Sequence, residues 1–146
     1  MKKSKYFAIK ELVCRHIYER YGEKAYMFID DRLIETLEII REKILGRPMI
    51  INTWAAGGNA TQRGVRCNLC SLVRNKSLSG QLYLSAHCMG KAADISVEGL
   101  TGEDMRRKII ARQDLLPYPI RMEADVAWLH IDLYDTGGGK ISLFNG

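Results

Sequence analysis

The sequence predicts an α+β fold in which helices from the first half pack on a small, mostly antiparallel sheet formed by the second half. Apolar residues recur at helical spacing before residue 48, whereas short runs of β-branched and aromatic residues, each bounded by turn residues, follow residue 90. The chain has 146 residues, of which 47% are hydrophobic, and this is enough for one core. We therefore expect residues 1–146 to form a single domain.

Two amphipathic helices are expected in the first half. The first is predicted over residues 8–20 and ends near Gly22, because residues of one face recur at helical spacing: Ile9, Leu12, Val13, His16 and Ile17. The second opens at Asp30 and Asp31 and carries one apolar stripe as far as Ile44, before Gly46 and Pro48 end it. These two helices are expected to cover a sheet.

The sheet is expected to come from short runs in the rest of the chain. MIINTW at 49–54 reads as a strand, and the stretch from 55 to 84 reads as a long loop without apolar period, a kind of segment that is often functional. Thr101 and Asp104 resemble a capping box that opens a helix over 102–113. Further strands are predicted at 92–97, 119–123, 127–134 and 140–144.

The formal net charge of +5 predicts a mild attraction to polyanions such as nucleic acid or anionic cell-wall polymers. A nucleic-acid binder would rest only on this charge and one CxxC pair, so we expect no nucleic-acid partner. The first residues lack the apolar core and cleavage site of a signal peptide, and no apolar run approaches the ~18 residues of a membrane span. We expect cytoplasmic synthesis, no membrane insertion and a monomer.

Four cysteines in a chain without an export signal indicate reduced thiols rather than disulfides. Cys67 and Cys70 have the CxxC spacing of a zinc knuckle or a redox pair. No second CxxC and no nearby HxxxH completes a set of four ligands, so we interpret them as two small thiols buried in a turn.

Two histidines and an aspartate stand where they could share a catalytic metal ion. His87 lies at the mouth of a loop and Asp94 on the strand that follows, and Gly90 with two alanines keeps the return path narrow. Catalytic zinc takes three protein ligands, usually imidazole nitrogens and carboxylate oxygens, and keeps one position for water. A loop that folds back here can direct both side chains at one ion.

His130 is the third candidate ligand. Alternation in AWLHIDLY places Trp128, His130 and Asp132 on one strand face and the aliphatic residues on the other, so His130 is expected to face a cleft. Asp132 could orient a ligand histidine, and Ser85 could fix the loop before His87. His16, the third histidine of the chain, is expected not to bind this metal.

The stretch SAHCMGKAAD, residues 85–94, matches the SxHxxGxAxD motif of the zinc D-Ala-D-Ala carboxypeptidases and peptidoglycan endopeptidases, peptidase family M15. WLHID at 128–132 resembles the second signature of that family, a tryptophan followed two residues later by the last histidine ligand. The first motif fixes five positions at fixed spacing, and the resemblance runs in order over roughly residues 48–134. It implies the hedgehog/DD-peptidase fold.

By this resemblance Zn²⁺ would be held by His87, Asp94 and His130, and an acidic residue before the last histidine would act as general base and acid. The usual position of that acid, three residues before the histidine, is Ala127 here. Glu123 is preferred because a hairpin would place it opposite the histidine strand, and Asp125 is its rival.

The family also uses an arginine upstream of the first motif to hold the substrate or its oxyanion, for which TQRGVR offers Arg63 and Arg66.

The resemblance implies a zinc metallopeptidase that hydrolyses an amide bond in peptidoglycan stem peptides, as a DD-carboxypeptidase or as an endopeptidase of the phage or prophage endolysin type. Such a lysin is made in the cytoplasm and acts at the cell wall after release, and a cytoplasmic dipeptidase is equally consistent with the missing export signal. The alternative is a non-catalytic zinc-binding module on the same scaffold, which hedgehog signalling domains resemble. The general base separates the two, because hydrolysis needs a proton carrier near the metal.

Overall fold

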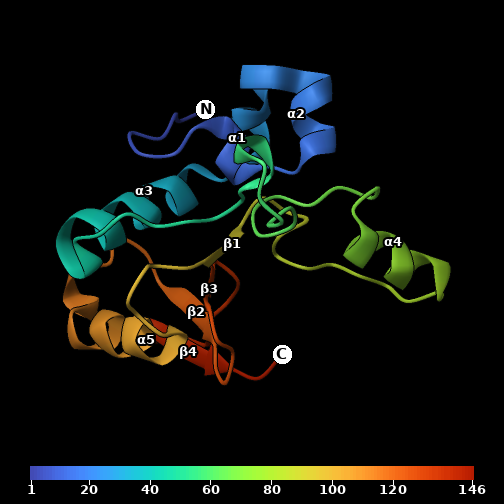
Figure 1. Cartoon of the computed structure of the whole chain (residues 1–146). Helices are drawn as coiled ribbons and strands as arrows, with labels where there is room; N and C mark the ends of the chain where they lie inside the picture. Colours follow the sequence, from blue (N-terminus) through green and yellow to red (C-terminus); the bar gives the residue numbers. More distant parts are fainter.

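The computed structural model describes all 146 residues and confirms the α+β fold (Figure 1). The α-helices are α1 (Ile9–Leu12), α2 (Arg15–Tyr21), α3 (Asp31–Ile39), α4 (Ser71–Leu78) and α5 (Gly102–Ala111). Shorter or wider helical turns are η1 (Gly22–Phe28), η2 (Ile40–Leu45), η3 (Trp54–Ala56) and η4 (Gln113–Leu115). The strands are β1 (Ala92–Ile95), β2 (Ile120–Glu123), β3 (Leu129–Asp132) and β4 (Ile141–Phe144). The hedgehog/DD-peptidase relationship stays a prediction.

The four strands form one mixed sheet in the order β1-β3-β2-β4. Strand β3 pairs antiparallel with β1 and with β2, and β4 lies parallel to β2 at the edge, so the sheet is mostly antiparallel as predicted. In the register of β1 and β3, Asp94 stands opposite His130. The sheet thus brings together two residues that are 36 positions apart in the chain.

The apolar side chains form one core cluster of 29 residues that draws on the N-terminal helices, α5 and the sheet. Helix α3 contributes a fully buried face that includes Leu33, Ile34 and Leu37, each worth about 1.5–3 kcal/mol of burial. Helix α5 packs against η2 and against β3. The sheet therefore stands on a packed apolar layer that fixes the positions of its side chains.

Two helix starts agree with the sequence prediction. The Asp30 side chain accepts a hydrogen bond from the Arg32 amide at 3.0 Å and caps α3, which continues through η2 and ends at Gly46 with a φ of 64°. Thr101 and Asp104 form the reciprocal capping box of α5, with distances of 2.9 and 3.0 Å.

The single helix predicted over residues 8–20 is wrong, because the chain breaks into α1 and α2 at Val13 and Cys14. Val13 is extended, with φ −128° and ψ 159°, and forms a parallel bridge with Val65. The Val13 side chain is fully buried, so it fits the apolar helical period although the chain is extended there and pairs with Val65.

Two other predictions for the middle of the chain also fail. Residues 49–54 form no strand: Ile50 makes one antiparallel bridge with Ser96, and the Asn52 amide then turns to the Glu11 carbonyl. The loop from 55 to 84 contains α4, which escaped prediction because Val73 is its one buried side chain and no apolar period marks it. Helix α4 stands out from the body of the molecule as an arm (Figure 1).

None of the helices combines the length and the apolarity that crossing a membrane requires.

Candidate metal centre

The structure brings the side chains of His87, Asp94 and His130 together at the sheet. All three are buried, and one nitrogen or oxygen of each lies within 4.8 Å of the others, so the group could hold a metal ion. His87 comes from the turn before β1, Asp94 from β1 and His130 from β3. The three candidate ligands are thus carried by two paired strands and a turn.

The His87 ring is held by the backbone at Gly64. Its Nδ1 donates a hydrogen bond to the Gly64 carbonyl at 2.9 Å, and its Nε2 lies 3.4 Å from Asp94 Oδ2. A side chain at position 64 would collide with the Leu12 carbonyl. A glycine is therefore needed at this position for the Gly64 carbonyl to reach the His87 ring. The hydrogen bond fixes the tautomer and leaves Nε2 as the nitrogen available to a metal ion.

The His130 ring is held in the same way by a carboxylate. Its Nε2 donates to Asp132 Oδ2 at 2.8 Å, and its Nδ1 lies 2.8 Å from Asp94 Oδ1. Arg121 fixes Asp132 in turn through two hydrogen bonds of 2.8 and 2.9 Å. Asp132 therefore stands where the sequence predicts a group that orients the ligand histidine.

The charges of the group depend on one another. Burial alone would lower the pKa of His130, but the hydrogen bonds to Asp132 and Asp94 outweigh it and raise the pKa to about 9. Burial would raise the pKa of Asp94, yet the bonds from His130 and His87 hold it well below its usual range. Burial would also raise the pKa of Asp132, but the hydrogen bonds from His130 and Arg121 outweigh it and lower the pKa to about 2. Since an imidazolium cannot bind a metal, a metal ion at this group would have to displace the proton of His130.

The tight turn that leads from His87 to Asp94 depends on Gly90. Its φ of 67° is left-handed, and a side chain there would collide with the Phe28 carbonyl. The Gly90 carbonyl accepts a hydrogen bond from the Asp30 amide at 3.0 Å, which fastens the turn to the start of α3. Ser85 Oγ accepts from the His87 amide at 3.3 Å and fixes the other side of the turn.

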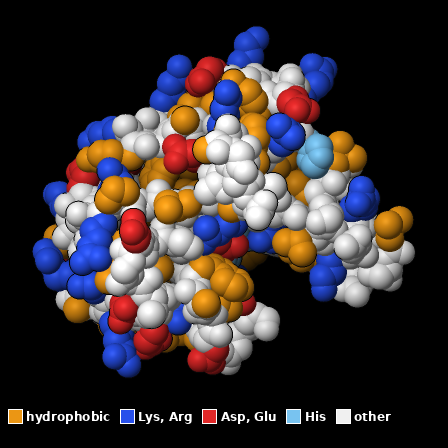
Figure 2. Space-filling view, viewed as in Figure 1, with side chains coloured by type: hydrophobic (Ala, Val, Ile, Leu, Met, Phe, Trp, Pro, Cys, Tyr) orange, Lys and Arg blue, Asp and Glu red, His pale blue; other side chains and the backbone are white.

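The three residues lie in the wall of a cleft of about 450 Å³ between the sheet and the α4 arm. Figure 2 shows the molecule hollowed here, with basic and acidic side chains meeting at the base. Most of the residues that line the cleft are polar or charged, and its aromatic side chains come from both sides: Tyr83, Trp128, Tyr134 and Phe144. A peptide-sized ligand has room in it.

Of the two carboxylates considered as general base, only Glu123 lines this cleft. The β2–β3 register pairs Met122 with Ile131, and its continuation puts Glu123 opposite His130. The Glu123 backbone carbonyl accepts a hydrogen bond from Arg106 Nη1 at 3.3 Å, and its carboxylate, which no side chain pairs, lies against the C-terminal Gly146. Asp125 is exposed in the following turn, with a φ of 60°, and does not line the cleft.

The two candidate arginines have different surroundings. Arg66 lines the cleft and places Nη2 3.4 Å from Asp94 Oδ2 and Nη1 3.1 Å from the Tyr83 hydroxyl. Arg63 turns the other way and donates to the Ser96 hydroxyl at 2.7 Å and the Ile51 carbonyl at 3.4 Å. Its guanidinium does not line the cleft, so we keep Arg66 alone as the candidate for substrate binding.

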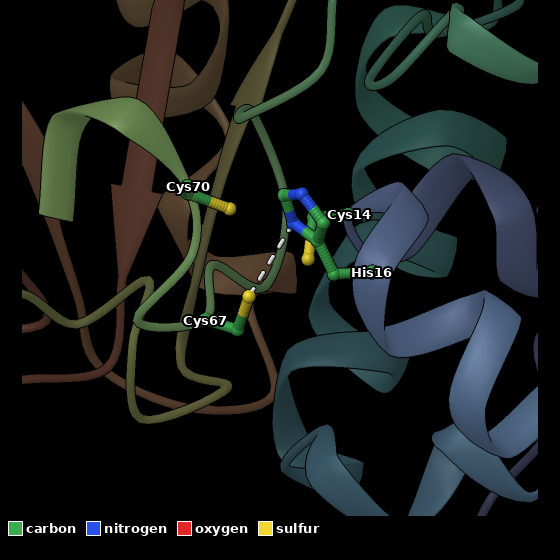
Figure 3. A group of neighbouring side chains, drawn as sticks. All are labelled: Cys14, His16, Cys67 and Cys70. Atoms are coloured by element: carbon green, nitrogen blue, oxygen red, sulfur yellow. Dashed lines mark hydrogen bonds between the residues drawn. The ribbon is translucent and has the colours of Figure 1, made fainter. Parts of the chain in front are cut away.

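A second group of side chains, Cys14, His16, Cys67 and Cys70, could also hold a metal ion. Figure 3 shows Cys14 and His16, from the start of α2, facing the two cysteines of the loop before α4. The interpretation of Cys67 and Cys70 as an incomplete set is therefore wrong, because Cys14 and His16 lie beside them, and 51 positions separate His16 from Cys67 in the chain. His16 belongs to this second cluster and not to the histidine centre.

Comparison of the chain with protein-family models, with curated proteins and with solved structures finds no match.

Proposed function

We propose that this protein is a zinc-dependent peptidase that hydrolyses an amide bond in peptidoglycan stem peptides. One observation carries the proposal: each of two buried imidazoles has one nitrogen fixed by a protein acceptor and the other directed at Asp94, beside a free carboxylate in a cleft. Fixed ligand histidines next to a separate proton carrier are what a hydrolytic metal centre requires.

The donor set suits zinc. Two imidazole nitrogens and one carboxylate oxygen match the three protein ligands of catalytic zinc sites, whereas calcium and magnesium prefer oxygen donors throughout. His87 Nε2, His130 Nδ1 and a carboxylate oxygen of Asp94 would be the ligand atoms. Zinc bound in this way supplies Lewis acidity toward a carbonyl and lowers the pKa of water toward about 7.

Glu123 is the proton carrier in this proposal. It faces the cleft from the strand next to His130, and its carboxylate lies against Gly146 without an ion pair to any side chain. It would accept the proton of the attacking water and pass it to the leaving amine. A free carboxylate at this place favours a peptidase over the non-catalytic zinc module.

The α4 side of the cleft supplies the positive charge for an anionic substrate. Arg66 and Lys76 both line it; Lys76 forms no ion pair, whereas Arg66 lies 3.4 Å from Asp94 Oδ2 and would bind a substrate carboxylate by exchanging that contact. Arg121 also lines the cleft, but Asp132 balances its charge. Stem peptides carry carboxylates, and the net charge of +5 favours approach to an anionic wall. We place the protein with the endolysin type, made in the cytoplasm and acting at the wall after release.

The test is the release of amino groups from purified peptidoglycan by the zinc-loaded protein, with and without a chelator. The expected result is release that stops with chelator and returns with added zinc, and mass spectrometry of the products identifies the bond. Bound zinc without any release would favour the non-catalytic module, and a protein that binds no metal at the histidine centre would contradict both.

A further inference from the structure

We infer that Cys14, His16, Cys67 and Cys70 form a second, structural zinc site, which fastens the base of the α4 arm to the N-terminal helices. This site is independent of the proposed peptidase activity, because none of its ligands lines the cleft. Its donor set, three thiols and one imidazole, is one of the standard sets for structural zinc.

The donor atoms are already close to coordination geometry. One atom from each residue lies within 4.8 Å of the others, and His16 Nδ1 lies 3.5 Å from Cys67 Sγ (Figure 3). Ligand atoms around a tetrahedral zinc lie roughly 3.5–3.8 Å apart, given a Zn–S bond of about 2.3 Å. A contraction of about 1.3 Å at most would therefore close the site around an ion. All four cysteines of the chain are free thiols, so no disulfide competes for the three ligands.

The backbone holds these residues in place. The Cys14 amide donates to the Val65 carbonyl at 3.0 Å, and the Val65 amide donates to the Leu12 carbonyl at 2.8 Å, so the two segments run side by side. The Leu69 amide donates to Cys67 Sγ at 3.3 Å, a bond that stabilises a thiolate. The ligands thus stand on a rigid frame before any ion binds.

Access and charge also fit an ion. Cys14 and Cys70 are buried, whereas Cys67 is half-buried and His16 is exposed, which leaves an entry path from solvent. Zinc with three thiolates and one imidazole carries a net charge of −1. Arg15 and Arg74 line the adjacent hollow of about 340 Å³ and offset that charge.

The site has a structural use in this fold. Val73 is the one buried side chain of α4, so apolar packing holds the arm weakly. Zinc bound to Cys70 at the start of α4 would fix it to α2. The same loop carries the Gly64 carbonyl that orients His87 and carries Arg66 in the cleft, so the ion would also steady one wall of the cleft. Four protein ligands leave no open position for water or substrate.

Cobalt titration of the reduced, metal-free full-length protein tests the site, because thiolate ligands give Co²⁺ a charge-transfer band in the near ultraviolet that imidazole and carboxylate ligands do not give. We expect a band that saturates at one equivalent of thiolate-bound cobalt and is displaced by zinc. His87→Ala should keep this band unchanged, which separates it from the histidine centre.

Variants identify the ligands. Cys67→Ser, at a half-buried position that tolerates serine, should lower the saturated band by about a third, because two of the three thiolates remain, and should weaken cobalt binding. His16→Ala, at an exposed position, should weaken cobalt binding at this site by about tenfold or more. Cys88→Ser is the matched control and should keep the full band. A wild-type protein without the band, a band that survives Cys67→Ser unchanged, or equal losses in Cys67→Ser and Cys88→Ser would overturn the inference.

Discussion

The histidine centre and the cysteine cluster differ in what surrounds their donor atoms. His87, Asp94 and His130 lie beside an open polar cleft with a free carboxylate, and both rings are oriented by further hydrogen bonds. The cysteine cluster has four protein donors, joins two distant segments and lies outside the cleft. The comparison shows that the number of ligands and the neighbouring groups, more than the ability to bind metal, separate a site suited to catalysis from one suited to stability.

The largest effect is expected from removing Glu123, the proposed proton carrier of the histidine centre. Glu123→Gln should lower the rate of peptidoglycan hydrolysis by about two to four orders of magnitude, because the amide cannot accept the proton of water. Its zinc content should equal that of the wild type, since Glu123 is not a ligand. The measurement is the initial rate of amino-group release at equal metal loading.

Asp125→Asn is the matched control for Glu123→Gln, because it removes the rival carboxylate from the exposed turn. It should keep the wild-type rate. The opposite pattern, with activity retained in Glu123→Gln and lost in Asp125→Asn, would contradict the assignment of the base.

A substitution at Gly90 should strain the turn that carries His87 while leaving all the candidate metal ligands in place. Gly90 and Gly80 both have left-handed φ values, of 67° and 74°, but only at Gly90 would a side chain collide with backbone. Gly90→Ala should therefore lower the free energy of unfolding by about 1–3 kcal/mol more than Gly80→Ala does. Denaturant unfolding of the two variants measures the difference, and equal losses would show that the close approach at Phe28 is unimportant.

Removing the group behind His130 should weaken the histidine centre alone. In Asp132→Asn the acceptor for His130 Nε2 loses its charge and the pairing with Arg121, so zinc affinity at this centre should fall about 10–100-fold. Competition with a chromophoric chelator measures the affinity. The thiolate band of cobalt at the cysteine cluster should stay the same, and a loss at both clusters would mean that the variant acts on the fold as a whole.

The smallest effect concerns motion of the α4 arm. Loss of zinc from the cysteine cluster in Cys67→Ser should speed amide hydrogen exchange in α4 by about tenfold, because the arm opens more often when its base is released. Amides of β3 should exchange as in the wild type. Exchange in α4 that is equally slow in Cys67→Ser and in the control Cys88→Ser would show that the arm does not depend on the metal.

The sequence was informative where the signals are local. The start of α3 at Asp30, the capping box at Thr101 and the last three strands follow from turn residues and alternation over a few positions. The spacing of His87 and Asp94, with alternation around His130, also predicted three side chains that the sheet does bring together. Their role in catalysis stays a prediction.

The failures have a common physical cause, which is dependence on distant partners. Val13 breaks the first helix because it pairs with Val65, and the same pairing completes the cysteine cluster. No periodicity or spacing reveals such a bridge. Helix α4 was missed for a related reason, since a helix with one buried side chain carries no apolar stripe. Arg63 and Arg66 cannot be distinguished in the sequence. The fold directs the Arg63 side chain toward Ser96, away from the cleft, and the Arg66 side chain into the cleft.

The most direct measurement compares the rate of amino-group release from purified peptidoglycan for His130→Ala and Cys67→Ser with that of the wild type, all with added zinc. The account predicts that His130→Ala abolishes release, whereas Cys67→Ser keeps most of it at a temperature where both are folded. Equal losses in the two variants, or release that survives in His130→Ala, would contradict the assignment of catalysis to the histidine centre and of stability to the cysteine cluster.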